Sequence, residues 1–128
     1  MVEVLKVKKL TSGSKKFEVL FPDGKKVKFG QMNASDYTIH KSPERMARYV
    51  ARHGGRQTKE TAPRAIHKDM LTVRSSTKEN WSKNGVKSPG FWSRWVLWSR
   101  PSLSAGIREA KTVLGPEYRV VWWGSGSL

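Results

Sequence analysis

The chain has 128 residues, and its 25 Lys and Arg residues against 10 Asp and Glu give a formal net charge of +15. Such an excess favours an anionic partner: nucleic acid, an acidic protein surface or anionic lipid. The absence of cysteine excludes disulfides, thiolate chemistry and cysteine-based zinc sites. The sequence has no apolar run long enough to span a membrane and no secretory leader, so we expect an intracellular or virion-enclosed protein.

The first 30 residues predict a small antiparallel β-meander. Strand patterns cover residues 2–10, 17–21 and 26–29, and the turn between the last two is Pro-Asp-Gly. Polar and apolar residues alternate in the third strand, which places Lys26 and Lys28 on the outward side. The meander therefore has one apolar face and one basic face.

The sequence from Ser42 to His53 predicts an amphipathic helix. Ser42 is a suitable N-cap, Pro43 suits the first turn, and Gly54-Gly55 ends the pattern. One side is apolar and aromatic, and the adjacent side bears a stripe of guanidinium groups. We call this stripe the arginine row; it consists of Arg45, Arg48 and Arg52.

The stretch from Ser88 to Pro101 is the most aromatic part of the chain. At helical spacing, Phe91, Trp95 and Trp98 fall on one face of a short helix, and we expect the core to be built on them. Exposed aromatic residues beside arginines would instead stack on the bases of a single strand. Helical spacing favours the core interpretation.

The remaining segments complete an α+β domain over residues 1–123. We interpret residues 56–78 as an inserted loop with one short helix, and 124–128 as a flexible tail. A second helix is predicted to end near Leu114, and residues 118–123 are predicted to return to the sheet as a C-terminal strand. The predicted fold is therefore a small N-terminal antiparallel β-meander packed with two or three short helices.

Two motifs carry a resemblance to a known family. They are Ser-Asp-Tyr-Thr-Ile-His-Lys at 35–41, continued by Glu44-Arg45, Arg48-Tyr49 and Ala51-Arg52-His53, and Gly-Phe-Trp-Ser-Arg-Trp at 90–95, continued by Leu97-Trp98. Together they resemble small basic proteins encoded by large nucleocytoplasmic DNA viruses, algal and amoebal giant viruses among them. The resemblance covers most of residues 16–110 and implies a viral setting much more than a mechanism. In that family the Arg-His motif runs almost directly into Glu-Asn-Trp, so the segment 56–78 departs from the pattern.

Catalytic chemistry is hard to assemble from this sequence. It has no paired carboxylates, no Glu-x-x-His and no phosphate-binding glycine loop. Asp36, Tyr37, His40 and His53 are the nearest candidates for a metal or a proton-transfer pair. The simpler interpretation is that these residues cap helices and tie down an irregular segment. We therefore expect no enzyme activity, no metal and no cofactor.

The candidate partner-binding residues are basic or aromatic. The arginine row is the most usable feature, since guanidinium groups bind phosphates or acidic side chains in bidentate fashion, although a solvated basic face remains the alternative. Trp123 is included because Trp122 and Trp123 point to opposite faces of a strand. The full set is Arg45, Arg48, Arg52, Arg94, Lys26, Lys28 and Trp123.

The first functional hypothesis is a minor capsid or internal protein of a large DNA virus particle, which cements neighbouring proteins through basic and aromatic surfaces. Its partners would be virion proteins such as the major capsid protein, and its location the virion, or the host cytoplasm or nucleus during assembly. The alternative is a sequence-independent DNA-binding protein that neutralises or organises viral DNA.

Overall fold

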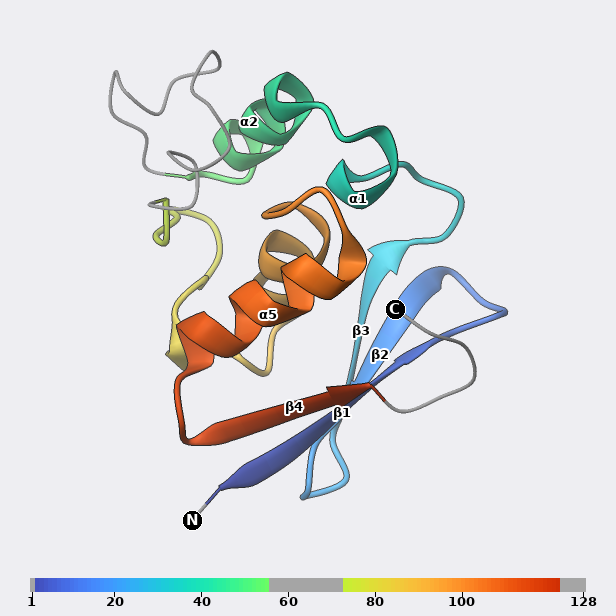
Figure 1. Ribbon diagram of the computed structural model, residues 1–128, viewed down its shortest axis with the longest axis vertical. Helices are drawn as coiled ribbons and strands as arrows, with labels where there is room; N and C mark the ends of the chain where they lie inside the picture. The colour runs from blue at the N-terminus through green and yellow to red at the C-terminus, as the bar shows by residue number, and fades with distance from the viewer. Residues whose placement is uncertain (1, 56–72, 123–128) are drawn as a thin grey trace.

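The computed structural model describes residues 2–55 and 73–122. Four strands form one mixed sheet in the order β3-β2-β1-β4, in which β1, β2 and β3 pair antiparallel and β4 runs parallel to β1 (Figure 1). Both the N-terminal meander and the return of the C-terminal strand are as the sequence predicts, and the fold is α+β. The strand bounds are β1 Glu3–Lys9, β2 Lys15–Leu20, β3 Lys26–Gln31 and β4 Tyr118–Trp122.

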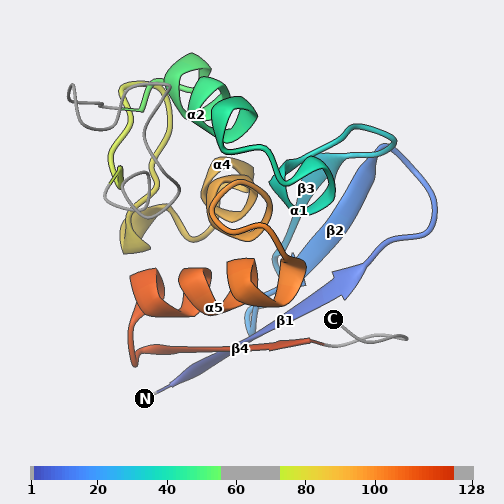
Figure 2. The same cartoon turned by 45° about the horizontal axis from the view of Figure 1, so that its top comes forward.

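The helices lie together on one face of this sheet. Figure 2 shows α5 directly over β1 and β4, with α4 and then α2 farther from these two strands, while Trp92 of α4 packs against Phe29 of β3. None of the helices in residues 2–55 and 73–122 is long and apolar enough to cross a membrane. The helix bounds are α1 Tyr37–His40, α2 Pro43–Arg52, the 3-10 turn η1 Lys83–Gly85, α4 Pro89–Trp92, the π-helical segment η2 Ser93–Leu97 and α5 Leu103–Leu114.

Alternation along the strands explains how the sheet divides into two faces. The side chains of alternate residues point to opposite sides of a strand, so the apolar residues of the meander turn together toward the helices. We call the opposite side, away from the helices, the outer face of the sheet. The buried inward residues are Leu5, Val7, Phe17, Val19, Val27, Phe29 and Val120.

The aromatic stretch forms the centre of the core, as the sequence predicts. Phe91 and Trp95 are fully buried, whereas Trp98 is partly buried and packs against the core. The indole N–H of Trp95 donates to the carbonyl of Trp81 over 2.8 Å. The backbone N–H of Trp98 donates to the carbonyl of Ser93, five residues earlier, so the helix widens into a π turn here. This stretch is therefore mainly internal scaffold, and of its rings only that of Trp98 is partly exposed.

Helix α5 packs closely against η2 at Gly106. A Cβ atom placed on Gly106 would lie 2.2 Å from the carbonyl oxygen of Val96 and 3.1 Å from that of Trp95. Both are backbone atoms, so neither can move aside as a flexible side chain would. The close approach of α5 to η2 therefore requires the absence of a side chain at this position.

We expect the substitution Gly106→Ala to lower the free energy of unfolding by about 1–3 kcal/mol, because overpacking forces the two helices apart. In an open helix the same change would stabilise by about 0.5–1 kcal/mol, so the sign itself is informative. Urea unfolding followed by tryptophan fluorescence measures it. Thr112→Ala, at an exposed position of α5, is the control and should change the stability little. A Gly106→Ala protein as stable as the parent would mean that α5 does not approach η2 this closely.

One region differs from the sequence predictions, and two predicted segments lie outside the described residues. The irregular segment that Asp36, Tyr37 and His40 were expected to tie down contains the short helix α1, capped by Asp36. The short helix predicted within the inserted loop, and the tail 124–128, lie outside the described residues.

Candidate functional site

Helix α2 begins and ends where its capping residues predict. The Ser42 hydroxyl accepts a hydrogen bond from the backbone N–H of Arg45 over 3.3 Å, and Pro43 occupies the first turn. Beyond His53 the chain turns at Gly54, where φ is +83°. The helix that carries the arginine row is thus fixed at both ends by local sequence.

The two sides of α2 are separated as the sequence predicts. Met46, Ala47 and Val50 are fully buried, while all three members of the arginine row are exposed. Within the described part of the chain, none of these guanidinium groups forms an ion pair with a carboxylate. At 1.5 Å of rise per residue the row spans about 10 Å along the helix. The arginine row is a solvent-facing strip of positive charge that no carboxylate of the described residues neutralises.

A column of stacked rings holds α2 in place. The ring of Tyr49 lies parallel to that of Trp98, with centroids 4.3 Å apart, and stacks on His53 at 4.0 Å on the same helix. His40, from α1, approaches Trp98 at 5.3 Å and so extends the column. Burial raises the pKa of the Tyr49 hydroxyl, which stays neutral at physiological pH. The arginine row therefore stands on a helix anchored by aromatic stacking, and its position is well defined.

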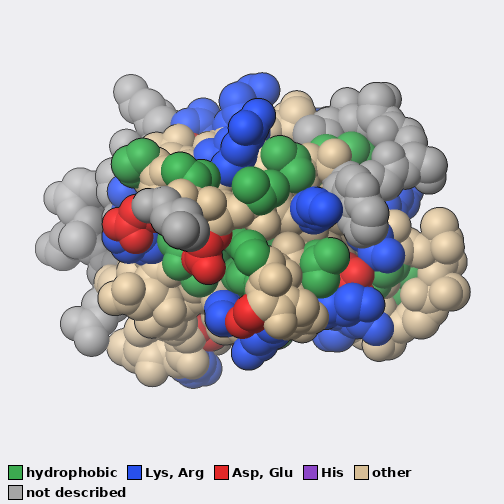
Figure 3. All heavy atoms as spheres, turned by 90° about the horizontal axis from the view of Figure 1, so that it is seen from below, with side chains coloured by type: hydrophobic (Ala, Val, Ile, Leu, Met, Phe, Trp, Pro, Cys, Tyr) green, Lys and Arg blue, Asp and Glu red, His purple; other side chains and the backbone are tan. Residues whose placement is uncertain are grey.

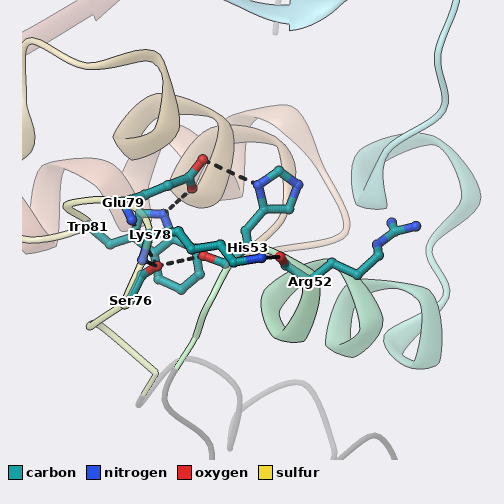
Figure 4. Close-up of polar contacts among 6 residues, drawn as sticks. All are labelled: Arg52, His53, Ser76, Lys78, Glu79 and Trp81. Atoms are coloured by element: carbon teal, nitrogen blue, oxygen red, sulfur yellow. Dashed lines mark hydrogen bonds and ion pairs between the residues drawn. The ribbon is translucent and has the colours of Figure 1, made fainter.

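A polar cluster ties the C-terminal end of α2 to residues 76–81 (Figure 4). Nδ1 of His53 lies 3.2 Å from one carboxylate oxygen of Glu79, and the other oxygen accepts from the indole N–H of Trp81 over 2.8 Å. The Lys78 ammonium donates to the Arg52 carbonyl over 3.2 Å. In Figure 4 the Arg52 side chain points away from Glu79, so this carboxylate leaves the arginine row open.

We expect Glu79→Ala to lower the free energy of unfolding by about 1–3 kcal/mol, because the buried indole N–H of Trp81 would lose its acceptor. Glu79→Gln keeps an amide oxygen for Trp81 and should lose less than half as much. Thermal or urea unfolding of the two proteins gives the comparison. Equal losses in both would show that the negative charge facing His53, rather than the acceptor for Trp81, is what matters here.

Two of the metal and proton-transfer candidates, Asp36 and His40, form hydrogen bonds with the backbone, whereas His53 faces the Glu79 carboxylate. Asp36 accepts from the Thr38 backbone N–H and from the Lys16 ammonium, over 2.9 and 2.7 Å. Nδ1 of His40 accepts from the backbone N–H of Ser42 over 3.0 Å. Among residues 2–55 and 73–122, no three or more His, Asp or Glu side chains group together to hold a metal ion. These contacts match the capping role that the sequence offered as the simpler interpretation.

Arg94 is not where the sequence placed it. Its side chain is fully buried, with the guanidinium carbon 4.5 Å from the ring centre of Trp95 and Nη1 donating to the Trp98 carbonyl over 2.7 Å. Burial lowers its pKa to about 10, which still leaves a cation at neutral pH. The expectation that Arg94 contacts a partner at the surface is therefore wrong. The residue belongs to the core, where cation–π contacts and the carbonyls of Trp98 and Val73 stabilise its charge.

The other predicted residues separate into two groups. Lys26 and Lys28 are exposed on β3, on the outer face of the sheet, whereas Trp123 lies outside the described residues.

The structure also presents a hollow of about 250 Å³ that sequence patterns did not indicate, between the end of β3, α2 and η2. Its lining includes Lys16 and Asp36, which form an ion pair although they lie 20 residues apart in sequence. No local motif could have revealed this pair.

Comparison with known proteins extends over part of this architecture. A family model described as "Family of unknown function (DUF5754)" matches residues 5–53. The matched range begins in β1 and ends at the residue after α2, so it includes the meander and the whole arginine row. No curated protein and no solved structure matches the chain.

Proposed function

We propose that this chain is a small basic structural protein of a large DNA virus particle, where it cements neighbouring components and catalyses no reaction. The observation that carries the proposal is the arginine row, exposed on an anchored helix and not paired with any carboxylate of the described residues. Rigid guanidinium groups bind carboxylates or phosphates with two parallel hydrogen bonds. A partner with acidic groups on its surface would satisfy these donors.

The cementing surfaces are basic rather than aromatic. Phe91, Trp92 and Trp95 are buried and Trp98 is only partly exposed, so the aromatic stretch offers a neighbour little surface. Contact with the major capsid protein or another virion protein would therefore depend on the arginine row and on the lysines of the outer face. The chain would be located in the virion, or in the host cytoplasm or nucleus during assembly.

Fractionation of disrupted virus particles tests this proposal. We expect the chain to remain with the protein shell after the genome is released, at a fixed ratio to the major capsid protein. Immunoblotting of the shell and nucleoprotein fractions against a capsid standard gives that ratio. Absence of the chain from purified particles would refute a structural role in the virion.

A second candidate is sequence-independent DNA binding, favoured by the polar character of the α2 surface. No large apolar or aromatic side chain is exposed along α2, whereas protein interfaces usually bury such groups at their centre. Phosphate contacts need only fixed positive charge. This candidate predicts equal affinity for duplexes of unrelated sequence and a steep loss of affinity with salt. Recovery of the chain in the nucleoprotein fraction, away from the shell, would favour it over the first proposal.

A further inference from the structure

We propose that the outer face of the sheet is a second docking surface, which takes an acidic segment of another protein that also carries aliphatic side chains. This deepens the proposed function and rests on it, because it names the class of partner that the outer face, a surface separate from α2, would take. In Figures 1 and 2 the sheet and α2 lie on opposite sides of α5 and α4. A chain with two such surfaces can hold two partners at once.

The outer face contains an apolar hollow at one end. The hollow has a volume of about 420 Å³ and lies between β1 and the turn after β2. Val2 and Val4 in its lining are 54% and 39% exposed, and they are two of the three large apolar residues that are exposed in the described part of the chain. Such a concentration of exposed aliphatic surface in a protein with few apolar residues outside its core indicates an interaction site. Its lining residues are Val2, Val4, Lys6, Leu20, Phe21 and Pro22.

Cations alternate with these aliphatic side chains across the strands. In the pairing register Lys26 lies opposite Leu20, Leu20 opposite Lys6, and Lys6 opposite Val121. Because neighbouring strands are about 4.8 Å apart, the two lysines in this row are separated by about 10 Å. Figure 3, the view from below Figure 1, shows hydrophobic side chains interspersed with Lys and Arg on this side of the molecule, with Asp and Glu side chains among them. The pattern fits a partner in which carboxylates flank aliphatic side chains.

Carboxylates of the described residues pair with only some of the cations on the outer face. Glu18, the acidic residue that β2 contributes to the outer face, is buried and lies 3.6 Å from the Lys8 ammonium. Lys26, Lys28 and Arg119 are exposed on the same face, and the described residues offer them no ion pair. An incoming segment must therefore supply negative charge.

A partner of acidic character fits better than a second copy of the chain or a lipid surface. Two copies would bring two positive faces together on molecules of net charge +15, and like charges at an interface oppose association. An anionic membrane would attract the lysines, but membrane-surface segments insert protruding aromatic and leucine side chains from a helix. Here short valines border a concave hollow in a sheet.

The test is a titration of the full-length, ¹⁵N-labelled chain with a short synthetic peptide of alternating Glu and Leu, followed by NMR and fluorescence anisotropy. We expect amide shifts at Val4, Leu20 and Val121 and not along α2. A peptide with every Leu replaced by Ser should bind about tenfold more weakly, because it buries no aliphatic surface. Equal affinity for the two peptides, or shifts confined to α2, would overturn the proposal.

Two variants locate the site, and a third separates it from the arginine row. Val4→Thr keeps a β-branched side chain at an exposed position and should weaken binding of the Leu peptide at least about fivefold. Lys26→Gln should weaken binding of a highly charged Glu/Leu peptide more than binding of a peptide with fewer Glu residues. The triple variant Arg45→Ala, Arg48→Ala and Arg52→Ala should change this affinity less than about twofold, so failure of the arginine row as a binding surface would leave this result intact.

Two control measurements complete the design. Sedimentation of the parent chain and of Val4→Thr at increasing concentration should show the same oligomeric state, because the outer face does not bind a second copy. Vesicles of phosphatidylserine and phosphatidylcholine should not displace the Leu peptide from the outer face. Self-association through Val4, or displacement by the vesicles, would assign the surface to a second copy or to a lipid and overturn the proposal.

Discussion

Replacing Trp95 with alanine should lower the free energy of unfolding by about 3–5 kcal/mol, the largest loss of stability that we expect from a single substitution in this chain. Trp95 is fully buried and its indole N–H donates to the Trp81 carbonyl. The ring also lies against the buried guanidinium of Arg94, at 4.5 Å. Removal of the indole leaves a cavity, an unpaired carbonyl and a less stabilised cation together. Urea unfolding monitored by circular dichroism measures the loss.

Trp95→Phe is the matched control for this prediction. It keeps an aromatic ring over Arg94 but lacks the indole N–H, so we expect a smaller loss of about 1–3 kcal/mol. A loss below about 1 kcal/mol for Trp95→Ala would contradict the account of the aromatic stretch as internal scaffold. It would favour an aromatic surface available to a partner.

If the chain binds duplex DNA, as the second candidate states, replacing the whole arginine row with alanine should weaken that binding on the order of a hundredfold near physiological salt. Each lost phosphate contact forgoes the release of one condensed counterion, and the slope of log affinity against log salt should fall by about 2.7. The members of the row are exposed, so the fold should tolerate the change. Anisotropy titrations at several salt concentrations, with two duplexes of unrelated sequence, give the affinity and the slope.

A charge-matched triple variant distinguishes a site from general positive charge. Lys9→Ala, Arg108→Ala and Lys111→Ala remove the same formal charge at exposed positions away from α2. We expect this protein to keep most of its affinity and its slope. If the two triple variants lose equal affinity, the binding is a diffuse effect of net charge and the arginine row is an ordinary solvated face.

Local sequence signals predicted the parts of the fold that depend on local physics. The alternation of Val27 and Phe29 with Lys26 and Lys28 set the faces of β3, because successive side chains of a strand point to opposite sides. Ser42 marked the start of α2 because its hydroxyl satisfies a free backbone N–H. The exposed arginine row follows directly from that helix and its periodicity.

Arg94 shows where sequence patterns fail. The sequence predicted Arg94 to be a partner-binding residue, but it lies in the π turn, which changes the angle between successive residues. Its burial also depends on a carbonyl of Val73, 21 residues away in the chain, which accepts from Nη2 over 3.2 Å. Periodicity within one segment carries no information on a distant backbone carbonyl. For the same reason the ion pair between Lys16 and Asp36 could not be read from either segment alone.

Labelling of arginines with phenylglyoxal in intact and disassembled virus particles tests most directly whether the arginine row holds an acidic partner. We predict that Arg45, Arg48 and Arg52 are protected in intact particles and react after dissociation in high salt. The exposed Arg108 on α5 should react in both states and serves as the internal control. Equal reactivity of the arginine row before and after dissociation would contradict the account.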